Sequence, residues 1–162
     1  MLVPRRAFIF VGTVGLLALA LCDCGRSGSP KFTLNKITGT SAQRVTRVTA
    51  IIGKHHAPPT ALLDAQFLEE QTGDGNLGPS DFQTFYRLDV APADILAWTR
   101  LLTPLGTKVE FAAPRGSCGW WISSEAFGAL KFYEPALLTG RSHGWIGLSL
   151  ETGRIYIFTF TM

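Results

Sequence analysis

The sequence predicts an α+β domain with a mainly antiparallel sheet, one principal packing helix at about residues 92–103, and a C-terminal β-hairpin. Three observations lead to this fold class. Several short segments alternate apolar and polar side chains, with the period of two residues that is typical of strands. One segment repeats apolar residues at helical spacing, and the last two apolar segments are separated by a short turn that contains glycine.

The first element is an export leader at residues 1–21. Arg5 and Arg6 precede an uncharged, mostly apolar run from Ala7 to Cys22, and a basic end followed by an apolar core is the layout of a secretion signal. As a helix this run is about 24 Å long, which is short for a bilayer core of about 30 Å. The two arginines are expected to stay on the cytoplasmic side, so that the rest of the chain crosses the membrane.

The end of the apolar run, Leu19-Ala20-Leu21-Cys22, resembles the lipobox of bacterial lipoprotein precursors, with Leu21 where that family usually has Gly, Ala or Ser. The resemblance implies that Cys22 carries lipid (palmitate among its acyl chains), becomes the new N-terminus and anchors the protein in the cell envelope, facing the periplasm or the exterior. Asp23 implies, by the same resemblance, retention at the inner membrane. Two alternatives stay open: cleavage after Ala20 to release a soluble protein, or an uncleaved anchor.

Residues 22–31 are a polar tether rich in glycine and serine, and residues 32–162 form a single globular domain. Removal of residues 1–21 takes away two of the 15 basic side chains and none of the 12 acidic ones, so the formal net charge falls from +3 to +1. Because the remaining chain has no basic cluster, nucleic acid is not an expected partner.

Strands are expected to begin the domain. Val45–Ile52 is rich in Val, Ile and Thr, the composition of a strand. Residues 61–71 could form a strand or a helix; their alternating polarity and the many turn residues at 72–81 favour a strand. Residues 82–90 are predicted to be a strand that forms a hairpin with 61–71 across this long loop.

The segment from Ala91 onward predicts the principal helix. Pro92 suits a first helical turn because its missing N–H has no partner there, and Asp94 places negative charge where the helix dipole favours it. Pro104 and Gly106 end the helix. Its apolar face consists of residues at helical spacing, namely Ile95, Trp98, Leu101 and Leu102.

Shorter elements are expected between this helix and the C-terminal hairpin. Lys108–Ala112 and Trp120–Ile122 have the composition of brief strands. Ser123 or Ser124 is expected to cap a short helix that runs to Leu130.

The clearest strand pattern lies at the C-terminus. Residues 144–150 and 155–161 are predicted to form a hairpin, and Gly153 supplies the positive φ that its turn needs. On the last strand Tyr156, Phe158 and Phe160 face one way and the alternate residues the other. Both faces are apolar, which indicates a central strand of the sheet.

The cysteines and histidines predict little chemistry. Cys24 and Cys118 are candidates for a disulfide in an oxidising compartment, the alternative being a separate thiol in each. His55 and His56 are adjacent and point to opposite sides of an extended chain, so no metal site is expected. The acidic loop at residues 74–81 lacks the ligand spacing of a calcium loop. The sequence predicts no catalytic residue, metal or cofactor.

Four residues are predicted to bind a partner. If Trp120 and Trp121 lie on a strand, one points inward and the other outward, beside the loop that carries Arg115. Exposed tryptophan and arginine are typical anchors for a protein partner. Arg141 is placed near them by hypothesis.

The predicted function is a non-enzymatic envelope lipoprotein that binds another protein or an envelope component and reaches the membrane through its lipid anchor. An immunity or inhibitor protein directed against a secreted toxin or hydrolase is a second interpretation. A small envelope hydrolase is a third, and a pocket that gathers a histidine, a carboxylate and a hydroxyl would favour it. The stretches Leu63–Trp98 and Trp120 to the end are similar to small uncharacterised bacterial envelope proteins, which implies no activity.

Overall fold

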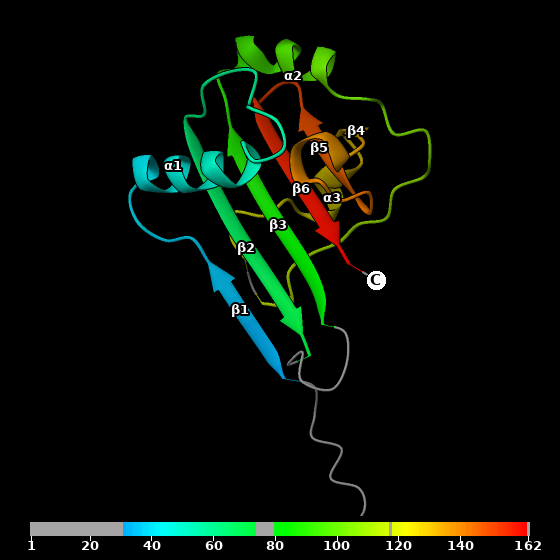
Figure 1. The fold of residues 1–162 in the computed structure, drawn as a ribbon. Coiled ribbons are helices and arrows are strands. Elements are labelled where there is room, and N and C mark those ends of the chain that lie inside the picture. The colour runs from blue at the N-terminus through cyan, green and yellow to red at the C-terminus, as the bar shows by residue number, and fades with distance from the viewer. Residues whose placement is uncertain (1–30, 74–79, 117, 162) are drawn as a thin grey trace, which may run out of the picture.

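The computed structural model describes residues 31–73, 80–116 and 118–161, and these residues form one six-stranded antiparallel sheet in the order β1-β2-β3-β6-β5-β4 (Figure 1). The strands are β1 (Phe32–Lys36), β2 (Asp64–Thr72), β3 (Asp81–Asp89), β4 (Lys131–Tyr133), β5 (Gly144–Ser149) and β6 (Arg154–Phe160). The helices are α1 (Ser41–Ile52), α2 (Ile95–Leu101), preceded by a 3₁₀ turn η1 (Pro92–Asp94), α3 (Ser124–Phe127) and α4 (Ala136–Thr139). The predicted α+β fold with a mainly antiparallel sheet is confirmed.

The strand predicted at Val45–Ile52 is instead part of α1, so that prediction is wrong. A capping box starts this helix: the Gln43 amide donates to the Thr40 hydroxyl at 3.4 Å, and the Gln43 side chain accepts from the Thr40 N–H at 2.9 Å. Val48 and Ile52 lie four residues apart and are fully buried against the sheet. Capping and tertiary packing together outweigh the β-branched composition of the segment.

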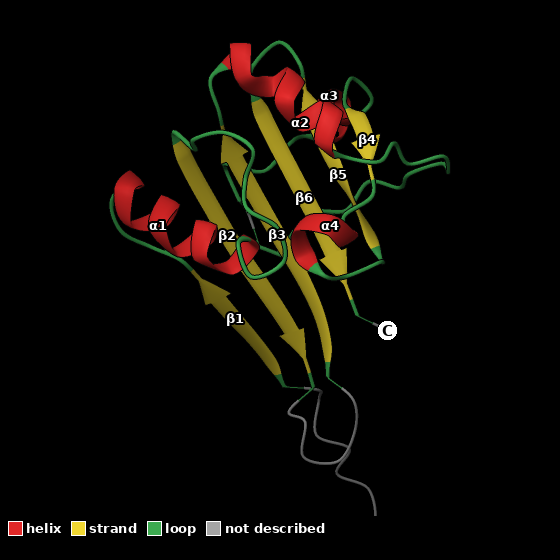
Figure 2. Cartoon of the chain, turned by 45° about the horizontal axis from the view of Figure 1, so that its top comes forward, coloured by secondary structure: helices red, strands yellow, loops and turns green. Residues whose placement is uncertain are grey.

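Helices α1, α2 and α4 contribute to the core on one side of the sheet, called here the helix face; α1 and α4 lie against it in Figure 2. The predicted helix is confirmed as η1 and α2, and Ile95, Trp98 and Leu102 of its apolar face are buried. The Trp98 indole donates to the Thr60 hydroxyl at 2.9 Å, which satisfies its one polar group inside the core. The sheet side of this core consists of Ala65, Phe67, Tyr86, Leu88, Ile146, Leu148, Ile155 and Ile157.

The opposite side of the sheet is covered by the strap, residues 105–130, of which residue 117 is outside the described part. Its apolar side chains pack on Leu68, Phe85, Trp145, Tyr156 and Phe158. The strap contains α3, whose N-terminus is capped by the Ser123 hydroxyl as predicted. We therefore call this side the strap face.

The strands predicted at 108–112 and 120–122 are wrong, because the described strap residues contain no strand. Backbone carbonyls of 108–112 bond to indoles instead of to a neighbouring strand. Trp145 Nε1 donates to the Glu110 carbonyl at 3.2 Å, and Trp121 Nε1 donates to the Ala112 carbonyl at 2.8 Å. Two carbonyls of this segment therefore find partners outside the sheet.

The C-terminal hairpin is confirmed as β5 and β6, and β6 is central because it pairs with β3 on its other side. Gly153 has a φ of +67° in the turn, as predicted. The two faces of β6 divide as expected: Tyr156 and Phe158 pack under the strap, and Ile155 and Ile157 under the helices.

Within the described residues no helix is long and apolar enough to cross a bilayer. The predicted leader, Cys22, Asp23 and Cys24 lie outside the described residues.

Candidate functional site

The four residues predicted to bind a partner fall on two sides of the sheet. Arg115, Trp120 and Trp121 belong to the strap. Arg141 follows α4 on the helix face, where its Nη1 donates to the hydroxyl of Thr84 at 2.6 Å. The structure therefore keeps the first three together and separates Arg141 from them.

Trp120 and Trp121 lie in a turn, not on a strand, and both are half-buried. Their rings meet edge to face with centroids 5.7 Å apart. Trp121 packs against Phe85 and Tyr156 of the sheet at centroid distances of 5.2 and 5.5 Å, so it is a core residue. Trp120 packs on Trp121 and lines a hollow together with Lys36 at the end of β1.

Strand β1 offers an open edge beside Trp120. The Gly73 amide donates to the Lys31 carbonyl, and the Ile37 amide donates to the Phe67 carbonyl. Because strand residues alternate, the odd-numbered residues of β1 bond to β2, and the N–H and C=O groups of the even-numbered residues point outward. All five residues of β1 are exposed.

The other edge of the sheet is already covered. Leu105 N–H donates to the Phe132 carbonyl at 3.0 Å, and Glu134 N–H donates to the Thr103 carbonyl at 2.9 Å, so the chain before the strap pairs with the outside of β4. Of the described residues, β1 alone presents a row of outward strand amides.

Apolar side chains lie along this open edge. Phe32 and Leu34 are each 44% exposed and lie two residues apart on the same side of β1. The Arg115 guanidinium lies 5.0 Å from the centroid of the Phe32 ring, a cation–π contact. A hollow of about 240 Å³ at the end of β1 is lined by Lys36, Leu68 and Trp120 among others.

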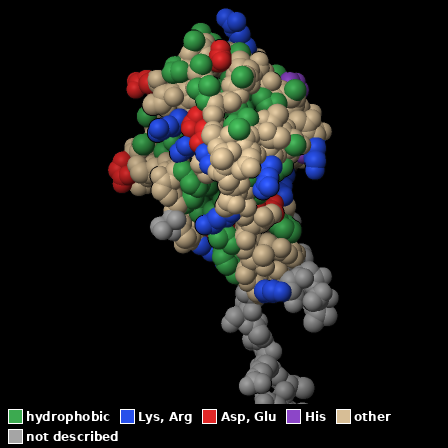
Figure 3. All heavy atoms as spheres, turned by 90° about the vertical axis from the view of Figure 1, so that its left-hand side faces the viewer, with side chains coloured by type: hydrophobic (Ala, Val, Ile, Leu, Met, Phe, Trp, Pro, Cys, Tyr) green, Lys and Arg blue, Asp and Glu red, His purple; other side chains and the backbone are tan. Residues whose placement is uncertain are grey.

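We call the set Phe32, Leu34, Lys36, Arg115 and Trp120 the edge surface. Figure 3 looks onto this side of the molecule and shows hydrophobic side chains and Lys or Arg side chains next to one another.

A buried carboxylate fixes the strap behind the edge surface. Glu70 of β2 is 2% exposed, and its Oε1 accepts from the Arg115 backbone N–H at 2.7 Å. The Arg115 Nε lies 3.9 Å from Oε2, which has no hydrogen bond from any described residue. Glu70 thus positions Arg115 over Phe32.

Cys118 is half-buried in the same part of the strap. Burial raises the pKa of its thiol, so the group stays protonated at neutral pH. It forms no disulfide within the described residues, and Cys24, the candidate partner, lies outside them.

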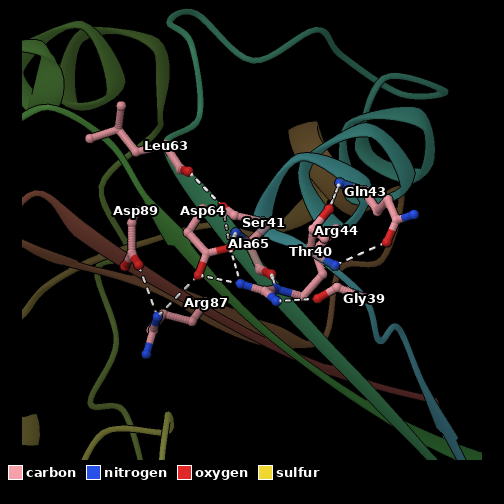
Figure 4. A network of polar contacts seen from close by, with 10 residues as sticks. All are labelled: Gly39, Thr40, Ser41, Gln43, Arg44, Leu63, Asp64, Ala65, Arg87 and Asp89. Carbon is pink, nitrogen blue, oxygen red and sulfur yellow. Dashed lines mark hydrogen bonds and ion pairs between the residues drawn. The ribbon is translucent and has the colours of Figure 1, made fainter.

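The rest of the outer edge of β2 is closed by Arg44 of α1 (Figure 4). Its Nε donates to the Ala65 carbonyl at 2.9 Å, and its Nη2 bonds both carboxylate oxygens of Asp64 at 2.6 and 2.7 Å. Burial alone would raise the pKa of Asp64, but hydrogen bonds from Arg44, Ser41 and the Ala65 amide outweigh it and lower the pKa.

A second site lies on the helix face, a cleft of about 510 Å³ between the end of α1 and the end of α4. Arg141 enters it from α4, and its Nη2 lies 3.7 Å from Glu69 Oε2. Tyr86 also lines the cleft, and burial, with a smaller contribution from Glu69, raises its pKa to about 12 despite Arg141. We call this site the Arg141 cleft.

Sequence analysis missed most of the Arg141 cleft. His55, for which the sequence predicted no site, lines the cleft, and its ring lies so close to Gly140 that a Cβ there would come within 2.4 Å. Glu69 lies on β2 and Tyr86 on β3, and no local spacing links them to Arg141. Among the described residues no three His, Cys, Asp or Glu side chains gather to hold a metal ion.

Comparison with protein families, with curated proteins and with solved structures finds no match to this chain.

Proposed function

We propose that the chain is a non-enzymatic envelope lipoprotein, tethered through Cys22, that binds an extended segment of another envelope protein by strand addition to β1. One observation supports this more than any other: β1 is an exposed edge strand with outward N–H and C=O groups at Phe32, Leu34 and Lys36. Such edges either carry protective devices or receive a strand from a partner.

The side chains of the edge surface indicate which residues the partner strand should carry. Exposed Phe32 and Leu34 favour apolar side chains at alternate positions of the partner strand. Lys36 and Arg115 flank them with positive charge, and Arg115 is 56% exposed. We therefore expect a partner strand that alternates apolar residues with others and contains an acidic residue.

The tether supports an envelope partner. Nine residues separate Cys22 from Phe32, and fully extended they reach about 30 Å. With lipid on Cys22, the edge surface would stay close to the membrane, within reach of proteins that are themselves anchored there. The immunity interpretation is one case of this proposal, in which the bound protein is a toxin or hydrolase.

The hydrolase interpretation has one observation in its favour, since the Arg141 cleft gathers His55, Glu69 and the Tyr86 hydroxyl. Catalysis by such groups needs a nucleophile bonded to a base. Among the described residues neither His55 nor Tyr86 makes a side-chain hydrogen bond, and Glu69 pairs with Arg141 instead. This arrangement favours binding over catalysis.

Affinity capture of the full chain from its own membranes, after cross-linking, tests the proposal when it is combined with two variants of Leu34. Leu34→Pro removes one outward N–H and leaves the β1–β2 hydrogen bonds in place, because proline is tolerated on an edge strand when its nitrogen faces solvent. Leu34→Ala removes the side chain but keeps the N–H. The comparison separates strand addition from simple apolar contact.

We expect wild type to capture a protein, Leu34→Ala to capture less of it, and Leu34→Pro to capture none while melting within a few degrees of wild type. Equal capture by Leu34→Pro and wild type would contradict strand addition. Mass spectrometry of the mature N-terminus tests the tether separately, because an unacylated terminus at Leu21 would contradict the lipoprotein assignment.

A further inference from the structure

The Arg141 cleft has the features of a ligand site in its own right. It is walled by the end of α1, by Asn35 of β1 and by the end of α4 with the residues after it, and strands β2, β3 and β6 form its floor. Its volume of about 510 Å³ lies within the range of small-molecule pockets in proteins. It lies on the helix face, whereas Arg115 and Trp120 belong to the strap on the other side of the sheet.

Arg141 has guanidinium N–H donors in the cleft that no described residue uses. One guanidinium N–H is used by the Thr84 hydroxyl at 2.6 Å, and Nη2 faces Glu69 at the longer distance of 3.7 Å. A guanidinium carries five N–H donors in a planar fork. The Arg141 side chain is 30% exposed, so the remaining donors are accessible from the cleft.

The charges in the cleft suit a ligand with a single negative charge. Among its described lining residues, Lys54 and Arg141 are cationic and Glu69 is anionic, which leaves one net positive charge when His55 is neutral. Glu69 would repel a second negative charge on a ligand bound to Arg141. A carboxylate fits this balance better than a phosphate dianion does.

Further groups lie where a carboxylate on Arg141 would be bound. Tyr86 lines the cleft, and its hydroxyl makes no hydrogen bond to a described residue. Its raised pKa keeps the proton on the phenol, so it can act only as a donor to an anion at neutral pH. Ile37, Ile51 and Phe67 form an apolar wall beside these polar groups.

We propose that the Arg141 cleft binds a monocarboxylate next to an apolar group, with Arg141 and Tyr86 on the carboxylate and the apolar wall around the adjoining chain. Two sources share this chemistry, a free carboxylic acid and the C-terminus of a polypeptide. Glu69, whose carboxylate lies 3.7 Å from Arg141, competes with the ligand for the guanidinium and limits the ligand to one charge.

Calorimetric titration of the folded chain with hexanoate tests the site, with hexanamide and inorganic phosphate as matched probes. We expect saturable binding of hexanoate and much weaker binding of both other probes. Equal binding of hexanamide would show that the carboxylate is not recognised, and stronger binding of phosphate would overturn the preference for one charge. Either result would contradict the proposal.

Two variants with opposite expected effects separate recognition from damage to the fold. Arg141→Gln should weaken hexanoate binding about tenfold or more, because a charge-assisted hydrogen bond is lost. Glu69→Gln should strengthen it several-fold, because the competing carboxylate is removed. A merely structural role for Glu69 predicts no gain, so an unchanged or lower affinity in Glu69→Gln would contradict the assigned role.

Arg100→Gln is the matched control, since it removes the same charge from an exposed residue of α2 outside the cleft. It should leave hexanoate binding unchanged. If Arg100→Gln weakened hexanoate binding as much as Arg141→Gln does, the effect would come from the net charge of the protein and not from the cleft, which would contradict the proposal. Peptides ending in leucine, with a free or an amidated terminus, identify the source. Binding of the free-ended peptide more tightly than hexanoate would assign the site to a polypeptide terminus, and the reverse order to a free acid.

Discussion

The Arg44 Nε donates to the Ala65 carbonyl at 2.9 Å, at the point on β2 beyond which β1 no longer pairs with it. The side chain takes the hydrogen bond that a longer β1 would have made. It thereby shields part of an otherwise open edge and ties α1 to the sheet.

Loss of this contact should destabilise the protein. Arg44→Ala removes hydrogen bonds to Ala65, Asp64 and Gly39, and it leaves a carboxylate that is 22% exposed without its main partner. We expect a loss of about 2–3 kcal/mol in the free energy of unfolding, measured by urea denaturation. Arg47→Ala, an exposed change on the same helix, is the control and should stay within about 0.5 kcal/mol of wild type. Similar losses in both variants would remove any special role for Arg44.

The lowered pKa of Asp64 predicts a dependence of stability on pH. A carboxyl whose folded pKa lies below its unfolded value binds its proton more readily when unfolded, so its contribution is complete above the unfolded pKa, near 3.8, and is lost as the pH falls through the folded pKa. The stability difference between wild type and Asp64→Asn should therefore be constant near neutral pH and shrink below about pH 4. Denaturation at a series of pH values measures it, and a difference that grows on acidification would contradict the assigned sign.

Alanine substitutions at Gly153 and Gly128 should differ in their effect on stability, because only Gly153 has a backbone conformation that strains a residue with a Cβ. Gly153 has a φ of +67°, and a Cβ there would approach the Val90 carbonyl oxygen to 2.4 Å. Gly128 has a φ of −63° and open space around the same position. We expect Gly153→Ala to cost about 1–3 kcal/mol or more in unfolding free energy and Gly128→Ala to be neutral or slightly stabilising. Equal melting temperatures for the two variants would refute this account of the turn.

The last strand should be indispensable. Removal of residues 157–162 deletes most of β6, the strand that joins β3 to β5 and contributes to the cores on both faces. We expect an insoluble or protease-sensitive product, scored by limited proteolysis. Removal of Met162 alone is the control and should leave the resistance intact. A soluble, resistant protein without 157–162 would show that the two halves of the sheet hold together without it.

Sequence patterns predicted those elements whose signals are local and agree with one another. Helix α2 has a proline start, an acidic first turn and apolar residues at helical spacing, and all three indicate a helix. In α1 the signals conflict, since Val45–Ile52 has strand composition while Thr40 and Gln43 form a capping box. Composition was the weaker signal because packing of Val48 and Ile52 on the sheet decided the outcome.

For the candidate sites too, contacts between residues close in sequence could be predicted and contacts between distant segments could not. Arg115 and Trp120 are close in sequence, and their shared position on the strap could be expected from it. Arg141 could not be placed, because its contacts with Thr84 and Glu69 join segments more than 50 residues apart along the chain. Such a site becomes visible only when the order and register of the strands are known.

Glu69 and Glu70 are neighbours on β2, yet one faces the Arg141 cleft and the other lies under the strap. A single inserted or deleted residue before them in this strand would move each side chain to the opposite face, so that one of the two surfaces would lose its carboxylate and the core residues ahead of the pair would change faces as well. Over evolution, we therefore expect the length of β2 ahead of this pair to be preserved in descendants of this chain, even where individual side chains change. An alignment of related sequences should therefore show substitutions in this part of β2 but no inserted or deleted residues.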